Sequence, residues 1–325
     1  MDSVRIGMIG CGGMARAHLR QLSAIPEARV AALADPSGEQ IAECVKQFPE
    51  LSSVPVYADY REMLSKERLD AVEIGTPHTQ HAAQILDSLA AGLHVLCEKP
   101  LVTSTADADT VIQALKDSGK VGLLSYQRHY QPEFRTLRER LQSREFGEVT
   151  FVSTILGQEW KRMTAGTWRQ DPALSGGGQL NDSGSHFVDV LLWATGLTPE
   201  TVVGFCDNRG APVDIDSAAA IRFRGGALAT ITVMGDFPTW HEDWTICCER
   251  GGFLIREGKI TLVQNDGSKT PAEPLEPGSD PDRNFVAAIL RGEPVEANFE
   301  HGKSVIQLTE AVWQSSAKGG MPISL

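Results

Sequence analysis

Asp182 and His186 are the residues whose types and spacing most directly suggest chemistry. They lie in the stretch GGGQLNDSGSHFVD (176–189), where the apolar run SHFVDVLLWATG predicts a buried helix that stops at Gly196. A spacing of four residues would place both side chains on one face of the first helical turn. A histidine can take or give a proton near neutral pH, and a carboxylate beside it fixes the ring and supports its charged form. The alternative is structural: Asp182 or Ser183 caps the helix, and His186 is a hydrogen-bonded core histidine. The preceding glycines favour the chemical interpretation, because they let a backbone pack close to a ligand.

Lys99 offers another reactive group, in the segment Glu98-Lys99-Pro100 at the end of the predicted strand HVLCEK. A lysine fixed at a strand end beside an acid can present its ammonium group to a ligand bound there. Pro100 fixes its own φ and restricts the backbone of Lys99, which favours a defined loop. An ordinary surface lysine is the alternative.

The elements that would position these residues begin with VRIGMIG (4–10), an apolar predicted strand that leads into the predicted helix GCGGMARAHLRQLSA. Its glycines form the pattern G-x-G-x-x-A. Gly10 permits a tight turn, Gly12 lets the backbone approach a pyrophosphate, and Ala15 allows close packing of helix on strand. Amides at the helix N-terminus add donors for an anion. A glycine-rich turn without a ligand is the alternative. The residues expected to cradle a dinucleotide are Gly10, Gly12, Gly13, Met14 and Ala15.

Asp35 ends the second predicted strand, ARVAALAD, 25 residues after Gly10. This is close to the offset of ~20 residues at which a carboxylate binds the ribose 2′-hydroxyl of a dinucleotide. A carboxylate there also repels a 2′-phosphate, so the sequence predicts NAD in preference to NADP. The alternative is that Asp35 caps the following helix, SGEQIAECVKQF.

Strands and helices then alternate through LDAVEIGT, HTQHAAQILDSLAAG, HVLCEK, ADADTVIQALKDSGK and VGLLSYQRH. This alternation predicts an α/β fold with a doubly wound parallel sheet. Ligands on such sheets bind beyond the carboxyl ends of the strands, which selects the loops GTPHTQH, EKPL and YQRHY. The predicted domains are a dinucleotide-binding domain over residues 1–124 and a second domain over residues 125–325.

The second half of the chain contains strand-like runs joined by short turns such as RGG and REGK, which predict an antiparallel sheet in an α+β domain. The link QNDGSKTPAEPLEPGSDP predicts a solvated loop before two closing helices, DRNFVAAILRG and EHGKSVIQLTEAVWQSSAKGG. Apolar faces of sugars stack on aromatic rings, and core or interface packing is the alternative role of a tryptophan. The candidate platforms are Trp160, Trp168, Trp240 and Trp244.

Composition narrows the classes of partner. Of the 325 residues, 42% are hydrophobic and 22% are charged, which is enough apolar material for two folded domains. A formal net charge of −12 argues against nucleic acid or an anionic membrane as a partner. No run approaches the ~20 apolar residues of a membrane span, and the N-terminus predicts a first strand and not a signal peptide, so a cytoplasmic protein is expected. Six cysteines lack the spacing of a zinc site, so we expect buried thiols and no metal.

Three motifs in this order, G-x-G-x-x-A, EKP (98–100) and GGGQLNDSGSHFVD, resemble those of the glucose-fructose oxidoreductase, inositol dehydrogenase and rhizopine-catabolism (Gfo/Idh/MocA) family. The resemblance spans nearly the whole chain, including DRNFVAAILRGEPVEA. It implies a Rossmann domain and a C-terminal α+β domain with a large, mainly antiparallel open sheet, whose open face commonly builds homodimers or homotetramers. It also implies a cis bond before Pro100 and a catalytic group made of Lys99, Asp182 and His186.

The resemblance further implies contacts with NAD(P) from the strand-end loops and from the segment TWRQDPALSGGG. For Trp168 and Arg169 in that segment, ordinary loop packing is the alternative. The residues assigned to the cofactor, besides the glycine turn and Asp35, are Thr76, Pro77, His81, Glu98, Lys99, Gln127, Trp168 and Arg169. The residues assigned to the substrate are Lys99, Arg128, Trp160, Asp182 and His186.

These expectations combine into one hypothesis, the NAD-dependent oxidation of a secondary hydroxyl on a sugar, polyol or related carbohydrate, or the reverse reduction. His186 would remove the hydroxyl proton, Lys99 would stabilise the alkoxide charge, and Asp182 would orient both. Two alternatives stay open. One is NAD-assisted glycoside cleavage by transient oxidation and elimination with the same residues. The other is an NAD-binding sensor without turnover, against which the intact set of proton-handling residues speaks.

Overall fold

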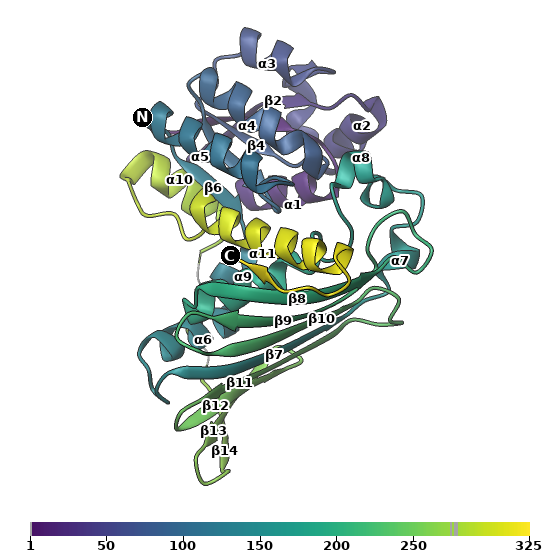
Figure 1. Cartoon of the computed structure of the whole chain (residues 1–325). Coiled ribbons are helices and arrows are strands. Elements are labelled where there is room, and N and C mark those ends of the chain that lie inside the picture. The colour runs from purple at the N-terminus through teal and green to yellow at the C-terminus, as the bar shows by residue number, and fades with distance from the viewer. Residues whose placement is uncertain (1, 274, 276–278) are drawn as a thin grey trace. The chain divides into compact units, whose positions relative to one another are not determined.

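The computed structural model describes residues 2–273, 275 and 279–325, and the chain divides into two compact units (Figure 1). The first unit is Met1–Val102, Ala106–Gln127 and Ser279–Gly302, and the second is Thr103–Thr105, Arg128–Gly278 and Lys303–Leu325. The sequence predicts a domain boundary between residues 124 and 125, and in the structure the chain passes from the first unit to the second between Gln127 and Arg128. The segment 279–302, which the sequence-based division places in the second domain, belongs to the first unit.

The first unit contains a six-stranded parallel sheet in the order β3-β2-β1-β4-β5-β6. The chain moves outward from β1 in one direction and then in the other, as the predicted doubly wound Rossmann sheet requires. Its strands are β1 (Val4–Ile9), β2 (Ala28–Ala34), β3 (Val56–Tyr57), β4 (Ala71–Ile74), β5 (His94–Glu98) and β6 (Gly122–Ser125). The connecting α-helices are α1 (Gly13–Leu22), α2 (Gly38–Gln47), α3 (Tyr60–Lys66), α4 (His81–Ala90) and α5 (Thr105–Ser118).

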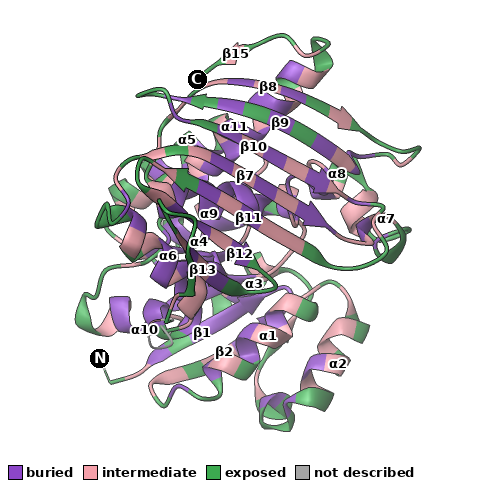
Figure 2. Ribbon diagram, turned by 90° about the horizontal axis from the view of Figure 1, so that it is seen from below, coloured by how far each residue is buried: buried purple, intermediate pink, exposed green. Residues whose placement is uncertain are grey.

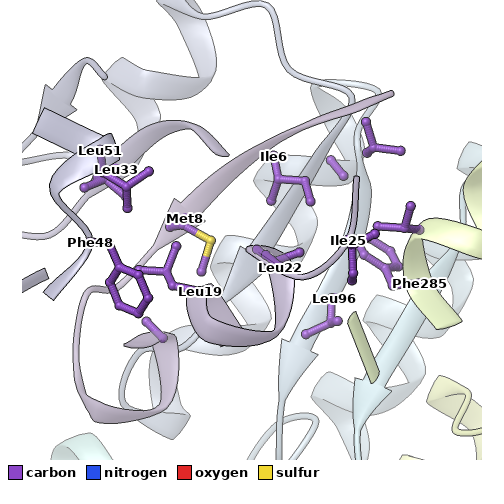
Figure 3. Packing of buried hydrophobic residues seen from close by; sticks show 14 of the residues in the cluster. Ile6, Met8, Leu19, Leu22, Ile25, Leu33, Phe48, Leu51, Leu96 and Phe285 are labelled. Atoms are coloured by element: carbon purple, nitrogen blue, oxygen red, sulfur yellow. The ribbon is translucent and has the colours of Figure 1, made fainter. Parts of the chain in front are cut away.

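Helix α10 (Pro281–Arg291) completes the core of this unit, although it is far from the other elements in sequence. Phe285 is 0% exposed and Val286 is 2% exposed, in one cluster with Ile6, Leu22 and Leu96. Figure 3 shows Phe285 beside Ile25, at the edge of the packing between α1 and the sheet. The apolar face of α10 is therefore the physical reason that the segment 279–302 joins the first unit.

The second unit contains a nine-stranded sheet in the order β14-β13-β12-β11-β7-β10-β9-β8-β15. Strands β7 and β10 pair in parallel and the other pairs are antiparallel, so the predicted mainly antiparallel sheet is confirmed. Its strands are β7 (Val149–Gly157), β8 (Pro199–Asp207), β9 (Asp216–Phe223), β10 (Leu228–Met234), β11 (His241–Cys248), β12 (Gly251–Arg256), β13 (Lys259–Gln264), β14 (Lys269–Pro271) and β15 (Ile323–Ser324). Its α-helices are α6 (Pro132–Gln142), α7 (Trp160–Met163), α8 (Pro172–Ser175), α9 (Ser185–Thr195) and α11 (Phe299–Ala317), which begins in the first unit.

One face of the nine-stranded sheet carries helices and the other is open. Helices α6, α9 and α11 lie on the same side of the sheet (Figure 1), and the central strands alternate between buried and exposed residues (Figure 2). Such alternation is typical of an antiparallel sheet with one solvated face. The expected open sheet is therefore present.

Two expectations about local structure need correction. The link after residue 263 was expected to be a solvated loop, but it contributes β14, and its residues 274 and 276–278 lie outside the described part of the chain. The six cysteines were expected to be buried, but only Cys11, Cys44 and Cys97 are; Cys206 and Cys248 are partly exposed, and Cys247 is exposed on the open face of β11. Among the described residues, no helix is long and apolar enough to cross a membrane.

Candidate functional site

The glycine turn between β1 and α1 has the shape expected of a ligand cradle. Gly10 has φ +93°, and a Cβ there would lie 2.7 Å from the backbone oxygen of Gly75, so only glycine fits. Ala15 is buried against Gly75. Gly12 and Gly13 have no such internal reason, since a Cβ on either would meet no atom within 4 Å. No side chain caps α1, and its first turn has no acidic residue. Open space beside uncapped amides fits the pyrophosphate of a dinucleotide.

Asp35, directly after β2, holds the glycine turn in place. Its Oδ2 accepts a hydrogen bond of 2.7 Å from the amide of Cys11, and its Oδ1 accepts one of 2.8 Å from the amide of Ser37. The cap of α2 is Ser37, whose hydroxyl accepts from the amide of Gln40, so Asp35 is not the helix cap. Each carboxylate oxygen has a second lone pair, which leaves Asp35 able to accept a ribose hydroxyl.

His81 has a different role from the cofactor contact expected of it. Its side chain is 0% exposed, with Nδ1 2.8 Å from the carbonyl oxygen of Pro100 and Nε2 3.0 Å from that of Thr76. Both ring nitrogens are used inside the protein, so the histidine ties the loop after β4 to the loop after β5. Thr76 and Pro77 are partly exposed and remain proposed cofactor contacts.

Glu98 also faces inward and not toward a ligand. It is 4% exposed, its Oε1 lies 3.0 Å from Nε2 of His18, and its Oε2 accepts a hydrogen bond of 3.1 Å from the amide of Lys99. The expected cofactor contact of this carboxylate is therefore replaced by a structural role, holding the backbone of the next residue. Lys99 itself is partly exposed, and the peptide bond between Lys99 and Pro100 is cis, as the family resemblance implies.

Gln127 follows β6 and begins a short 3₁₀ helix, Gln127–Tyr130. Its Oε1 is buried and has no hydrogen-bond partner within the described part of the chain. An unpaired buried acceptor costs about 1–3 kcal/mol, so a donor on a bound ligand would relieve that cost. With the glycine turn and Asp35, this residue makes the first unit fit a dinucleotide.

The glycines at 176–178 are held by packing inside the second unit. The amides of Gly178 and Leu180 donate to Oδ1 and Oδ2 of Asp214 over 2.9 and 3.0 Å. A Cβ on Gly178 would lie 1.9 Å from the backbone oxygen of Asp214, and one on Gly177 would lie 2.5 Å from the ring of Trp313. The segment is a fixed turn, and its glycines are explained by this packing and not by the expected approach of a ligand.

The spacing of Asp182 and His186 predicts that both lie in the first turn of the helix. In the structure, Asp182 lies instead in the turn before α9. The helix begins at Ser185, and its N-cap, Gly184, receives no side-chain cap, so the capping alternative also fails. Asp182 is 5% exposed, and His186 in the first turn of the helix is partly exposed. The sequence therefore located the two residues correctly near one helix end but assigned Asp182 to the wrong local structure.

Trp160 and Arg169 fix the orientation of the Asp182 carboxylate. The indole nitrogen of Trp160 donates to Oδ2 over 2.8 Å, and Nε of Arg169 donates to the same oxygen over 3.0 Å. The expected role of Trp160 as a substrate contact is corrected, because its side chain is 2% exposed and packs against Val213 and Ile215. The guanidinium of Arg169 also lies 4.5 Å from the ring centre of Trp168, and both residues are partly exposed. They remain proposed cofactor contacts.

Arg128, also expected to contact the substrate, is buried in an internal ion pair. Its Nη1 and Nη2 lie 2.5 and 3.0 Å from the two carboxylate oxygens of Glu242. Its guanidinium carbon lies 4.9 Å from the ring centres of both Phe134 and Phe187, and the residue is 7% exposed. Both terminal nitrogens are thus engaged by a carboxylate inside the unit, and this internal ion pair argues against the expected substrate contact.

Two residues that shape these regions were missed from the sequence, Asp214 and His18. Asp214 lies in a stretch without a motif, and no signal in the sequence links it to the glycines it holds. His18 does carry a signal, because it falls on the same face of α1 as Ala15 and Leu22, both buried. A buried histidine needs hydrogen-bond partners for its ring nitrogens, so its position on this face predicts that His18 contacts polar groups elsewhere in the unit.

Comparison with known proteins agrees with the arrangement of both units. Residues 4–126 match the oxidoreductase family with an NAD-binding Rossmann fold (GFO_IDH_MocA), and residues 134–254 match the GFO/IDH/MocA C-terminal domain. The chain is 28% identical to inositol 2-dehydrogenase from Streptomyces avermitilis over 269 residues, which cover 81% of this chain and 75% of that protein. It is 26% identical to levoglucosan dehydrogenase from Pseudarthrobacter phenanthrenivorans, over 98% of this chain and 97% of that protein.

Among solved structures, the fold is similar to that of an aldose-aldose oxidoreductase from Caulobacter crescentus crystallised with glycerol. The TM-score is 0.87 at 20% sequence identity, over 99% of this chain and 100% of that chain. Because the two family models match in sequence order and together cover most of the chain, it belongs to the Gfo/Idh/MocA family of NAD-binding oxidoreductases.

Proposed function

We propose that this protein oxidises a secondary hydroxyl of a sugar, polyol or related carbohydrate with NAD, or catalyses the reverse reduction. The observation that carries the proposal is the Asp182 carboxylate, fixed by donors from Trp160 and Arg169 and placed four residues before His186. Similarity to proteins named inositol 2-dehydrogenase and levoglucosan dehydrogenase supports the substrate class. A carboxylate oriented in this way is suited to control proton transfer to or from a hydroxyl.

The proposed roles follow from the chemistry of each side chain. NAD, when bound, supplies the acceptor for the hydride. His186 takes the hydroxyl proton, because an imidazole nitrogen is suited to act as a general base toward a hydroxyl group. Lys99 stabilises the developing alkoxide by a charge-assisted hydrogen bond, and Asp182 orients the groups that exchange the proton. We assign these three residues as the catalytic group.

The first unit would hold the dinucleotide through its glycine turn. Gly12 and Gly13 leave open space beside the uncapped end of α1, where amides can bind the pyrophosphate. Asp35 would accept the ribose hydroxyls and disfavour a 2′-phosphate. Gln127 would gain a partner for its buried amide oxygen. This set favours NAD over NADP.

The test is NADH formation, followed by absorbance across sugars, sugar acids and inositols, with NAD and NADP compared. A substrate should appear within these classes, and Lys99→Ala and His186→Ala should each lower kcat by ~10²-fold to 10⁴-fold. Normal turnover in either variant would remove that residue from the proposed roles. Glycoside turnover without net NADH would replace the proposal with redox-assisted cleavage, and NAD binding without any turnover would replace it with a sensor.

We propose further that copies of this chain associate through the open face of the nine-stranded sheet. Phe205 and Leu228 are 59% and 42% exposed on the strands β8 and β10 of that sheet. A second copy of the chain packed on this solvated face would remove such apolar side chains from water. Light scattering coupled to size exclusion should give a dimer or tetramer for the unaltered chain, and Phe205→Glu should shift it toward the monomer.

A further inference from the structure

A buried cluster of four ionisable side chains lies inside the first unit, and its centre is His18 on α1. His18 is 4% exposed, and its ring nitrogens approach carboxylates from two other elements. Nδ1 lies 2.9 and 3.0 Å from the two oxygens of Asp282 on α10, and Nε2 lies 3.0 Å from Oε1 of Glu98 at the end of β5. The ring therefore bridges the helix that follows the glycine turn, the strand that leads to Lys99 and the returning helix α10.

A fourth group, Glu73 on β4, lies beside this bridge. It is 1% exposed, with Oε2 3.9 Å from Nδ1 of His18. Burial and the neighbouring charge of Asp282 raise the pKa of Glu73 well above its usual range, which favours the neutral carboxyl. Three carboxyl groups can share this interior because one of them keeps its proton.

His18 itself is favoured in the charged form. Burial opposes that charge, but the carboxylate of Asp282 and the hydrogen bonds to Asp282 and Glu98 together raise the pKa of His18 well above its usual value. Conversely, burial would raise the pKa of Glu98, but the hydrogen bond and the charge of His18 outweigh it and lower that pKa to about 2. An imidazolium donates through both nitrogens, so it satisfies Asp282 and Glu98 at once.

Stability alone does not account for such a cluster. Burying ions costs several kcal/mol for each, and an apolar set of similar volume often gives equal or greater stability. Hydrogen bonds between charged groups supply direction, which apolar contacts do not. Here the orientation of the Glu98 carboxylate also fixes the backbone of Lys99, since the Glu98 oxygen not used by His18 accepts a hydrogen bond of 3.1 Å from the Lys99 amide.

We propose that His18 is a positioning residue for Lys99, acting through Glu98, and that Asp282 anchors His18 for this purpose. The chain of contacts runs from Asp282 to His18, then to Glu98, and ends at the backbone amide of Lys99. The same ring sits on α1, which begins at the glycine turn, so one side chain sets the place of the lysine loop relative to the start of the cofactor helix. For catalysis this inference rests on the proposed function, but the structural link can be tested without turnover.

The test is hydrogen–deuterium exchange of the full chain, read by mass spectrometry on peptides that cover residues 94–102. In His18→Gln, which loses the charge and one of the two donor nitrogens, exchange at the Lys99 amide should be at least ~10-fold faster than in the unaltered chain. Once a sugar substrate is known, kcat should fall ~10-fold to 100-fold while KM for NAD changes less than ~3-fold, because small displacements of a catalytic group act mainly on the reaction step.

His129→Gln is the matched control. His129 is 0% exposed, and its Nε2 lies 2.8 Å from Oδ1 of Asp189, so this variant also breaks a buried histidine–carboxylate pair, in the second unit. It should lower stability without changing exchange at residues 94–102. Equal exchange in His18→Gln and the unaltered chain would overturn the proposal, as would an equal acceleration in the control.

Asp282→Asn keeps the inference testable if His18→Gln does not fold. It retains one acceptor for Nδ1 and removes the charge that favours the imidazolium, so exchange at Lys99 should accelerate by ~3-fold or more. No acceleration would overturn the inference. The two proposals fail in different measurements. Absence of sugar oxidation would contradict the proposed function and leave the faster exchange at Lys99 unaffected, whereas unchanged exchange at Lys99 in a chain that oxidises sugars would contradict only the role of His18.

Discussion

The indole nitrogen of Trp160 donates a 2.8 Å hydrogen bond to the Asp182 oxygen that Arg169 also contacts, so a buried ring holds a proposed catalytic carboxylate. Trp160→Phe removes this donor and keeps an aromatic ring. Since a hydrogen bond to a charged group is worth about 1.5–3 kcal/mol, we expect kcat to fall at least ~10-fold in steady-state assays, with little change in the KM for NAD.

Trp244→Phe is the control for that measurement. Trp244 is 1% exposed, so it is not the sugar platform considered from the sequence, and its indole nitrogen donates over 3.0 Å to a different carboxylate, Glu242. This variant should lose a similar amount of stability and keep its kcat. Equal kcat values in the two variants would show that the bond to Asp182 has no part in catalysis.

Gly178→Ala should destabilise the second unit severely. The added Cβ would lie 1.9 Å from the backbone oxygen of Asp214, where no flexible side chain can move aside. We expect a loss of at least ~3 kcal/mol in the free energy of unfolding, at the upper end of overpacking costs, measured by urea denaturation. Gly38→Ala, where a Cβ meets nothing within 4 Å, should change that free energy by less than ~1 kcal/mol. A similar loss in both variants would contradict the packing explanation.

Asp35→Ser should shift the cofactor preference from NAD toward NADP. The change removes the charge that repels a 2′-phosphate and one acceptor that holds the amide of Cys11. We expect the ratio of kcat/KM for NAD to kcat/KM for NADP to fall at least ~10-fold, about 1.4 kcal/mol of discrimination. The control is Asp59→Ser, which removes an exposed acid that accepts from the amide of Arg61 in the same unit. An unchanged ratio in Asp35→Ser would remove Asp35 from cofactor selection.

Stability should fall as the pH rises above neutrality. The pKa of His18 is raised in the folded state, so its contribution is complete below its unfolded pKa near 6.5 and is lost as the pH rises through the folded value. The raised pKa of Glu73 acts in the same direction. The urea midpoint should therefore decline as the pH rises above about 6.5, and less steeply in His18→Gln. A flat profile would contradict a charged His18.

At acid pH the dependence is opposite, and stability should fall as the pH is lowered. The pKa of Glu98 is lowered to about 2, so its contribution is present above its unfolded pKa and is lost as the pH falls toward 2. Glu98→Gln should therefore weaken the acid-induced loss of stability, measured as the urea midpoint between about pH 5 and 2.5. The same acid response in both proteins would show that Glu98 is not the group responsible.

The sequence predicted most elements of both units because their apolar periods are regular. The alternation of strands and helices gave the doubly wound sheet, and Lys99 was placed correctly directly after β5. Long-range pairs were beyond such reasoning. His18 and Asp282 are 264 residues apart, and Arg128 and Glu242 are 114 apart, so neither partner could be identified from local spacing.

The wrong assignments share one physical cause. Trp160 and Arg128 are of types that often bind sugars, and residue type cannot tell a side chain that faces a ligand from one that is satisfied internally. His81 and Glu98 lie in loops correctly placed at the strand ends, but their side chains turn inward to backbone and His18. Loop position could be predicted, whereas the direction of each side chain depends on partners elsewhere in the chain.

The return of α10 to the first unit sets an order of events during synthesis. Phe285 and Val286 complete a core whose other fully buried members all precede residue 128, and Asp282 of the same helix contacts His18. At roughly 5–20 residues per second, the ribosome needs about 8–30 seconds to pass from the end of β6 to α10. Through that interval His18 lacks Asp282, and the apolar residues that Phe285 and Val286 cover have no partner helix, so the first unit can complete its core only after most of the second unit has been made.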